Sequence, residues 1–244
     1  MGRIFFFLLM TAGPLFAAGP ITHAYLTDRF FAHFPRYTAE EKKAFMVGTL
    51  FPDIQYLGAA VREETHWSGV ALVDVLTERS PFLAGVKFHS YVDELRERFV
   101  CDKKIYHMLS ESKEGDKKKL YLKLKLLEDE MIYSMQDWQG YRTALQDILQ
   151  EERQWEIENR ILRKWHTILQ ACFSNPPSTI FFLLNMTKTN YLHISAEEAL
   201  QWSKMLKTEV HSRQIRQFVL ALLQQFERDF SQVKKQGGAI KSVG

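Results

Sequence analysis

The amino-acid sequence predicts an all-α fold, in the form of a single-domain helical bundle. Apolar residues recur at helical spacing through three long segments, with Glu, Lys, Arg and Gln between them: residues 82–100, 141–173 and 214–233. The 244 residues are 46% hydrophobic, which is enough to bury one sizeable core. No shift in composition divides the chain, so we predict one domain.

The first residues have the order of a secretory signal peptide. Arg3 precedes the apolar run 4–16, and the small residues Ala, Ala and Gly follow. This run is shorter than the ~20 residues that a membrane-spanning helix needs. We therefore predict a signal peptide over residues 1–17, a mature helical domain over residues 18–233, and a secreted or periplasmic location. A buried N-terminal helix or an uncleaved anchor is the alternative.

Two helix starts inside the mature domain are predicted from capping boxes. Thr38 stands three residues before Glu41, and Ser195 stands three residues before Glu198. In residues 120–126, Leu alternates with Tyr or Lys, as in a strand, but the Leu and Lys content favours a helix. We predict that this segment is helical.

Loops are predicted where proline or polar residues interrupt the helical pattern. Residues 51–53 and 175–178 contain prolines, which push the preceding residue out of the helical region. Residues 110–119 are polar, and we expect an exposed connection there. The tail at residues 234–244 is predicted to be disordered.

The charge balance does not indicate a particular class of binding partner. The chain has 32 Lys and Arg against 29 Asp and Glu, and a net charge of +3 is too small to indicate a nucleic-acid surface. We expect no stable nucleic-acid complex. Cys101 and Cys172 can form one disulfide or remain free thiols. The oligomeric state stays open.

Four short motifs carry residues that can bind a metal. Each has an ordinary explanation when taken singly: an incidental His beside a helix cap, a turn closed by Asp, a packed aromatic corner and a surface pair. The last motif is a His and an Asp four residues apart on a predicted helix, where both side chains can reach one ion. In chain order the motifs are Thr22-His23, Pro52-Asp53, His66-Trp67 and His89-x-x-x-Asp93.

The order of these motifs resembles that of the zinc-dependent phospholipase C family. The motif sequences are most similar to those of the catalytic domain of glycosylphosphatidylinositol-specific phospholipase D. The fungal single-strand nucleases share a related zinc cluster. The likeness covers about residues 18–100. It implies a helical bundle of the zinc-dependent phospholipase C type that holds Zn²⁺.

The resemblance also implies a ligand set. One zinc ion would take Asp53, His66, His89 and Asp93, and Asp93 would bridge to a second ion that also takes His23. In the family, the amine and carbonyl of the mature N-terminal residue complete the coordination of the second ion. Ala18 stands at that place here, where the family usually has Trp. An α-amine has a pKa of about 7.7 to 8.0 and is readily deprotonated to bind a metal, so signal removal would be required for activity.

A third zinc ion is left open by the sequence. The family places a further His shortly after the His-x-x-x-Asp motif, but this chain has Glu, Arg and Phe at residues 97–99. His107 and Glu111, four residues apart, can supply a metal-binding pair, and residues 128–130 are an alternative source of carboxylates. Their ordinary interpretations are a surface pair and a solvated run of charge. We predict two zinc ions.

Histidine and carboxylate ligands on zinc favour hydrolysis, because such sites lower the pKa of a bound water toward ~7. We predict hydrolysis of phosphodiester bonds, above all in phospholipid headgroups, with peripheral membrane contact. Asp53 is the predicted catalytic residue, which orients or deprotonates the attacking water. The alternatives are a nuclease or nucleotidase with the same cluster, favoured by stacking platforms and a basic groove, and an inactive zinc-stabilised binding module.

Overall fold

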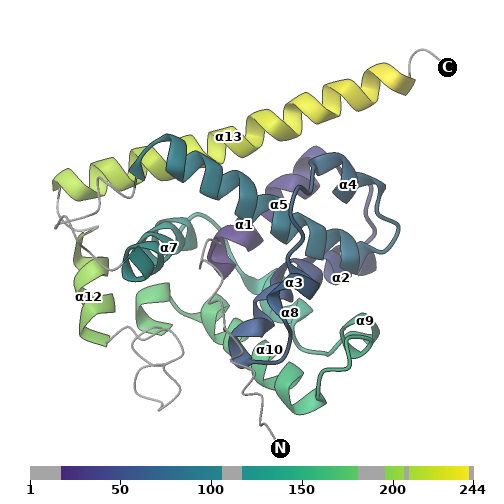
Figure 1. The fold of residues 1–244 in the computed structure, drawn as a ribbon, viewed down its shortest axis with the longest axis horizontal. Helices are drawn as coiled ribbons and strands as arrows, with labels where there is room; N and C mark the ends of the chain where they lie inside the picture. The colour runs from purple at the N-terminus through teal and green to yellow at the C-terminus, as the bar shows by residue number, and fades with distance from the viewer. Residues whose placement is uncertain (1–17, 106–116, 181–195, 206–208, 242–244) are drawn as a thin grey trace, which may run out of the picture.

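The structure is a computed structural model, which describes residues 18–105, 117–180, 196–205 and 209–241. Every regular element in these ranges is a helix, so the predicted all-α fold is confirmed (Figure 1). None of the described helices is long and apolar enough to cross a membrane. The elements are α1 Pro20–His33, α2 Ala39–Leu50, η1 Pro52–Leu57, α3 Arg62–Thr65, α4 Leu72–Thr77, α5 Pro81–Asp102, α7 Lys117–Tyr133, α8 Gln139–Ala144, α9 Gln150–Arg153, α10 Asn159–Ser174, α12 Ala196–Met205 and α13 Glu209–Lys241.

Two local predictions are confirmed. The N–H of Glu41 donates to the hydroxyl of Thr38, and the N–H of Thr38 donates to the Glu41 carboxylate, so α2 starts with a capping box. Residues 120–126 lie inside α7 and are helical. Ser195 and the predicted signal peptide at residues 1–17 lie outside the described residues, and α12 begins at Ala196.

Three predicted segments differ from the structure. Residues 141–173 form three helices, α8, α9 and α10. Glu156, which lies between α9 and α10, adopts a left-handed conformation with φ 56° that an α-helix cannot contain. The predicted loop at 51–53 leads directly into the 3₁₀ helix η1, where Pro52 takes a first-turn position that needs no N–H donor. Residues 234–241, the described part of the predicted disordered tail at 234–244, continue α13, and Lys234, Lys235 and Gln236 there favour helix.

An aromatic core joins α1, α2 and α5. The rings of Phe30 and Phe45 lie 5.1 Å apart, the rings of Phe30 and Phe88 also lie 5.1 Å apart, and all three side chains are fully buried. Phe230 on α13 closes this cluster, with its ring 6.0 Å from Phe30. The long α13 lies across the bundle (Figure 1). Its Phe230 packs against Phe30 on α1 and Phe88 on α5, so it holds these two helices in place relative to each other. These two helices carry most of the candidate site.

The closest helix contact joins α2 and α5 through two glycines. A Cβ built on Gly48 would overlap the backbone carbonyl of Phe82, and one built on Gly85 would overlap the carbonyl of Phe45. Both obstacles are backbone atoms, which cannot rotate away as a side chain does. The missing side chains therefore allow α2 to lie directly against α5.

Gly85→Ala is expected to destabilise the fold by about 1 to 3 kcal/mol, because the added methyl pushes α5 away from α2. Gly140→Ala is the matched control: a Cβ there meets only Met46 at 3.9 Å, so the gain in helix propensity of roughly 0.5 to 1 kcal/mol is expected. Chemical denaturation of both variants measures the difference. Equal stability of the two variants would contradict the close contact.

Candidate metal centre

Five predicted ligand side chains meet at one place. They form two groups in which the nitrogen and oxygen atoms lie within 4.8 Å of one another, and His89 belongs to both. The groups are His23, His89 and Asp93, and Asp53, His66 and His89. Distant segments supply them, since His23 comes from α1, Asp53 from η1, His66 from the end of α3, and His89 with Asp93 from α5. These buried groups can hold a metal ion.

The Asp93 carboxylate lies between the neighbours of both groups. Its Oδ1 is 3.1 Å from Nε2 of His23, whereas its Oδ2 is 3.3 Å from Nε2 of His89 and 3.9 Å from Nε2 of His66. The rings of His23 and His89 stack at 4.0 Å. The two oxygens of one carboxylate thus face different sets of imidazoles, which is the arrangement that a bridging ligand needs.

Asp53 and His66 complete the second group. The Asp53 Oδ1 is 4.0 Å from Nε2 of both His66 and His89, and these two nitrogens are 3.1 Å apart. Nδ1 of His89 lies 2.9 Å from the backbone carbonyl of Thr49, so this nitrogen carries a proton and donates a hydrogen bond to the carbonyl. Such a bond orients the ring and leaves the Nε2 lone pair for a metal.

Several buried polar atoms of the cluster have no hydrogen-bond partner among the residues that the structure describes. They are Nδ1 of His23, Oδ1 of Asp53, Oδ2 of Asp93 and the hydroxyl of nearby Tyr56. A buried polar atom without a partner costs about 1 to 3 kcal/mol, and more when it is charged. A cation between the carboxylates would satisfy both orphaned carboxylate oxygens, so the donor set fits a metal ion.

Two of the three imidazoles, those of His23 and His66, are suited to metal binding at neutral pH. Burial and the positive charge of His89 lower the pKa of His23 to about 4 and that of His66 to about 3. Burial also opposes the charge on His89, but Asp93 and Asp53 raise its pKa. Metals bind the neutral imidazole, so protons compete little for His23 and His66 at pH 7.

The start of α1 is held against the cluster by α7. The Asp129 carboxylate accepts hydrogen bonds from the N–H of Thr22 at 2.9 Å, the hydroxyl of Thr22 at 2.7 Å and the N–H of Ile21 at 3.2 Å. It therefore caps α1 from another helix. A Cβ on Gly19 would overlap this carboxylate, which explains the glycine. The N–H of buried Ala18 consequently donates to Asp93 Oδ1 at 2.8 Å.

The prediction that residues 128–130 form a solvated run of charge is wrong. Glu128 and Asp129 are buried, and the Glu128 carboxylate accepts from Arg96 at 2.9 and 2.7 Å. Glu130 accepts from Ser178. The helical period of α7 turns these carboxylates toward different neighbours, and spacing alone could not reveal those partners. In the described ranges, none of them joins a histidine in a metal-binding group.

Other predicted residues have varied outcomes. His107 and Glu111 lie outside the described residues, so the third zinc stays a prediction. Cys101 and Cys172 are free thiols.

Sequence reasoning missed Lys125 on α7, whose Nζ lies 5.8 Å from the Tyr56 ring. Burial lowers the pKa of Lys125, and Asp53 and Asp93 act against that change, so this cation lies within the field of the cluster.

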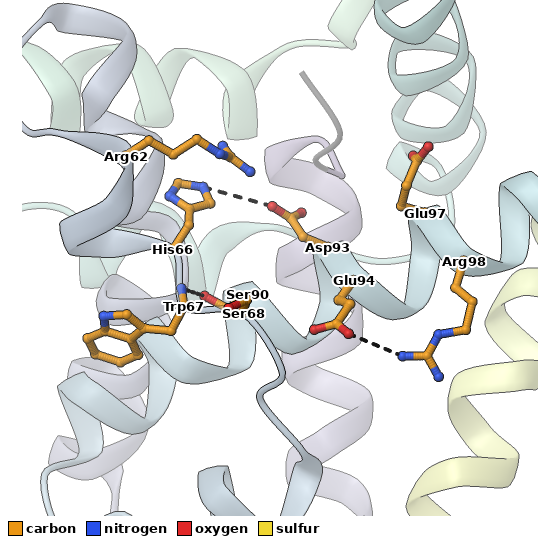
Figure 2. A pocket seen from close by; sticks show the side chains of 9 residues that line it. All are labelled: Arg62, His66, Trp67, Ser68, Ser90, Asp93, Glu94, Glu97 and Arg98. Carbon is orange, nitrogen blue, oxygen red and sulfur yellow. Dashed lines mark hydrogen bonds and ion pairs between the residues drawn. The ribbon is translucent and has the colours of Figure 1, made fainter. Parts of the chain in front are cut away.

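The cluster opens to a cavity of about 460 Å³. His66 and Asp93 contribute to its wall, so a small molecule can approach the metal-binding atoms (Figure 2). The N–H of Trp67 donates to the hydroxyl of Ser90 at 3.0 Å, which fastens the loop after α3 to α5. The lining residues are Arg62, His66, Trp67, Ser68, Ser90, Asp93, Glu94, Glu97 and Arg98.

Comparison of the chain with protein-family models, curated proteins and solved structures found no match. The function is therefore argued from the chemistry of the cluster and its cavity.

Proposed function

We propose that this protein is a zinc-dependent hydrolase of phosphodiester bonds, acting on phospholipid headgroups. The observation that carries the proposal is a buried cluster of imidazoles and carboxylates, with unpartnered oxygens on Asp53 and Asp93, beside an open cavity. Nitrogen and oxygen donors of this kind suit zinc. Secretion through residues 1–17 remains part of the proposal.

The ligands divide between two ions at Asp93. Asp53, His66, His89 and one oxygen of Asp93 would hold the first ion, and His23 with the other oxygen would hold the second. The opposed neighbours of Oδ1 and Oδ2 support this division. The Ala18 nitrogen lies on the Oδ1 side, where the amine of a chain that begins at Ala18 would join the second ion.

Zinc, when bound, supplies a Lewis acid that makes hydroxide available near pH 7 and stabilises charge on a phosphate. The chain supplies the positioning. Asp53 follows the rigid Pro52; one oxygen of its carboxylate would hold the metal ion, and the other can orient the attacking water and accept its proton. Asp93 and the three imidazoles would hold the ions on one side of the cavity, so that a phosphate in the cavity would be attacked from that side while its leaving group departs on the opposite side.

The cavity favours a headgroup over a nucleic acid. Single-stranded nucleic acids bind to several stacked aromatic rings along a basic groove. Among the described residues that line this cavity, Trp67 is the one Phe, Trp or Tyr, and two glutamates offset two arginines. Its lining therefore supports the lipid substrate.

We expect the chain that begins at Ala18 to bind two zinc ions and to release headgroups from phosphatidylcholine or phosphatidylinositol. Zinc content by elemental analysis, followed by parallel assays on both lipids and single-stranded DNA, tests this expectation. A chelator should abolish turnover, and added zinc should restore it. Cleavage of DNA alone would favour the nuclease, whereas zinc binding with no turnover would favour a binding module.

A further inference from the structure

The two arginines that line the cavity have contrasting surroundings. The guanidinium of Arg98 lies 3.4 Å from the Glu94 carboxylate, so its charge already has a partner (Figure 2). Arg62, in contrast, makes no side-chain hydrogen bond or ion pair with any residue that the structure describes. One cation of the cavity is thus left free for a ligand.

Arg62 is positioned by the same short helix as His66. Arg62 begins α3, and the N–H of His66 donates to its carbonyl at 2.8 Å, so the two side chains lie one turn apart. Figure 2 shows the Arg62 side chain running beside the His66 ring, with the guanidinium toward the Asp93 side. The free cation therefore lies at the metal end of the cavity.

The other end of the cavity carries negative charge. Glu94 and Glu97 line this end. Arg98 lies 3.4 Å from Glu94, and Arg96 lies 3.5 Å from Glu97. Each of these two arginines is therefore already paired with a carboxylate. An anionic group is consequently favoured beside Arg62 and disfavoured beside the glutamates. The planar guanidinium donates two parallel hydrogen bonds to phosphate oxygens, a geometry that lysine cannot supply.

We propose that Arg62 binds the phosphate of the substrate and so selects phosphoesters over uncharged esters. This inference rests on the proposed function, because it places the phosphate between Arg62 and the metal-binding side chains. Arg62 touches the substrate in this arrangement, whereas Arg98 remains a surface residue paired with Glu94.

Arg62→Gln tests the assignment, with Arg98→Gln as the matched control and Arg62→Lys as the conservative variant. The first measurement is the affinity of the zinc-loaded protein for inorganic phosphate, by calorimetry. We expect Arg62→Gln to weaken phosphate binding by roughly 10- to 100-fold, the usual size of a lost hydrogen bond to a charged group. Arg98→Gln should change it by less than about 2-fold, and Arg62→Lys should fall between. Zinc content should be unchanged in all three.

The second measurement compares two substrates, bis(p-nitrophenyl) phosphate and uncharged p-nitrophenyl acetate. Arg62→Gln should lower kcat/KM for the phosphate diester alone. Equal losses on both substrates, equal effects of the two arginine variants, or a wild-type protein that binds no phosphate would each overturn the inference. If the wild-type protein binds zinc and phosphate but hydrolyses neither phosphodiester lipids nor bis(p-nitrophenyl) phosphate, the proposed function fails while the phosphate measurement still decides the role of Arg62.

Discussion

Asp93→Asn is expected to lower phosphodiester hydrolysis by more than about 100-fold, because even groups that only support a metal ligand cost about 10- to 100-fold when changed. The carboxylate faces His23 through Oδ1 and His89 through Oδ2. An amide presents one oxygen and one NH₂ group, and the NH₂ group cannot bind an ion. The variant should therefore lose at least one zinc together with its activity, as elemental analysis and the lipid assay would measure.

Asp28→Asn serves as the control for removing a partly buried carboxylate. Asp28 lies on α1, as His23 does, but it accepts hydrogen bonds from Gln136 and Tyr141 instead of facing the cluster. Burial raises the pKa of Asp28, so a neutral amide is tolerated there. Zinc content and turnover should stay at the wild-type level in this variant. Unchanged turnover in Asp93→Asn would contradict the bridge.

The full chain of 244 residues is expected to bind one zinc fewer than the chain that begins at Ala18. In the full chain the Ala18 nitrogen is a peptide N–H, which donates to Asp93 Oδ1 at 2.8 Å. Removal of residues 1–17 converts it into an α-amine with a pKa of about 7.7 to 8.0, whose lone pair can bind a metal. The same atom thus changes from a hydrogen-bond donor into a ligand.

Two further chains control for the position of the amine. A chain that begins at Ala17 places the amine one residue before Ala18, and a chain that begins at Gly19 removes the Ala18 nitrogen. Both should bind one zinc fewer than the chain from Ala18, although their folded cores are the same. Zinc titration with a competing chelator measures all four chains. Full zinc content in the uncleaved chain would exclude the role of the amine.

The predictable part of the site is local. His89 and Asp93 could be placed on one face of a helix because their four-residue spacing determines that geometry. The convergence of His23 and Asp53 on that pair could not be derived from spacing, since it depends on how α1 and η1 pack against α5. Only the resemblance in motif order predicted it, and the geometry of the cluster agrees with that order.

The part that could not be predicted depends on partners from distant segments. A run of three acidic residues normally indicates solvent exposure, yet Glu128 is buried because Arg96 pairs with it from α5. Asp129 is buried because it caps α1. The break between α9 and α10 likewise depends on the backbone of Glu156, and the pattern of apolar residues does not reveal its left-handed conformation. Periodicity identifies helices, but it does not identify what a buried charge will contact.

The cap that Asp129 provides has a consequence for biogenesis. Asp129 follows Thr22 by 107 residues, so a ribosome must synthesise the chain through α7 before the first turn of α1 gains its anchor. Before these tertiary contacts form, His89 and Asp93 are the two cluster residues that a single helix brings together. A metal ion held by the whole cluster would therefore be bound after the tertiary structure has assembled.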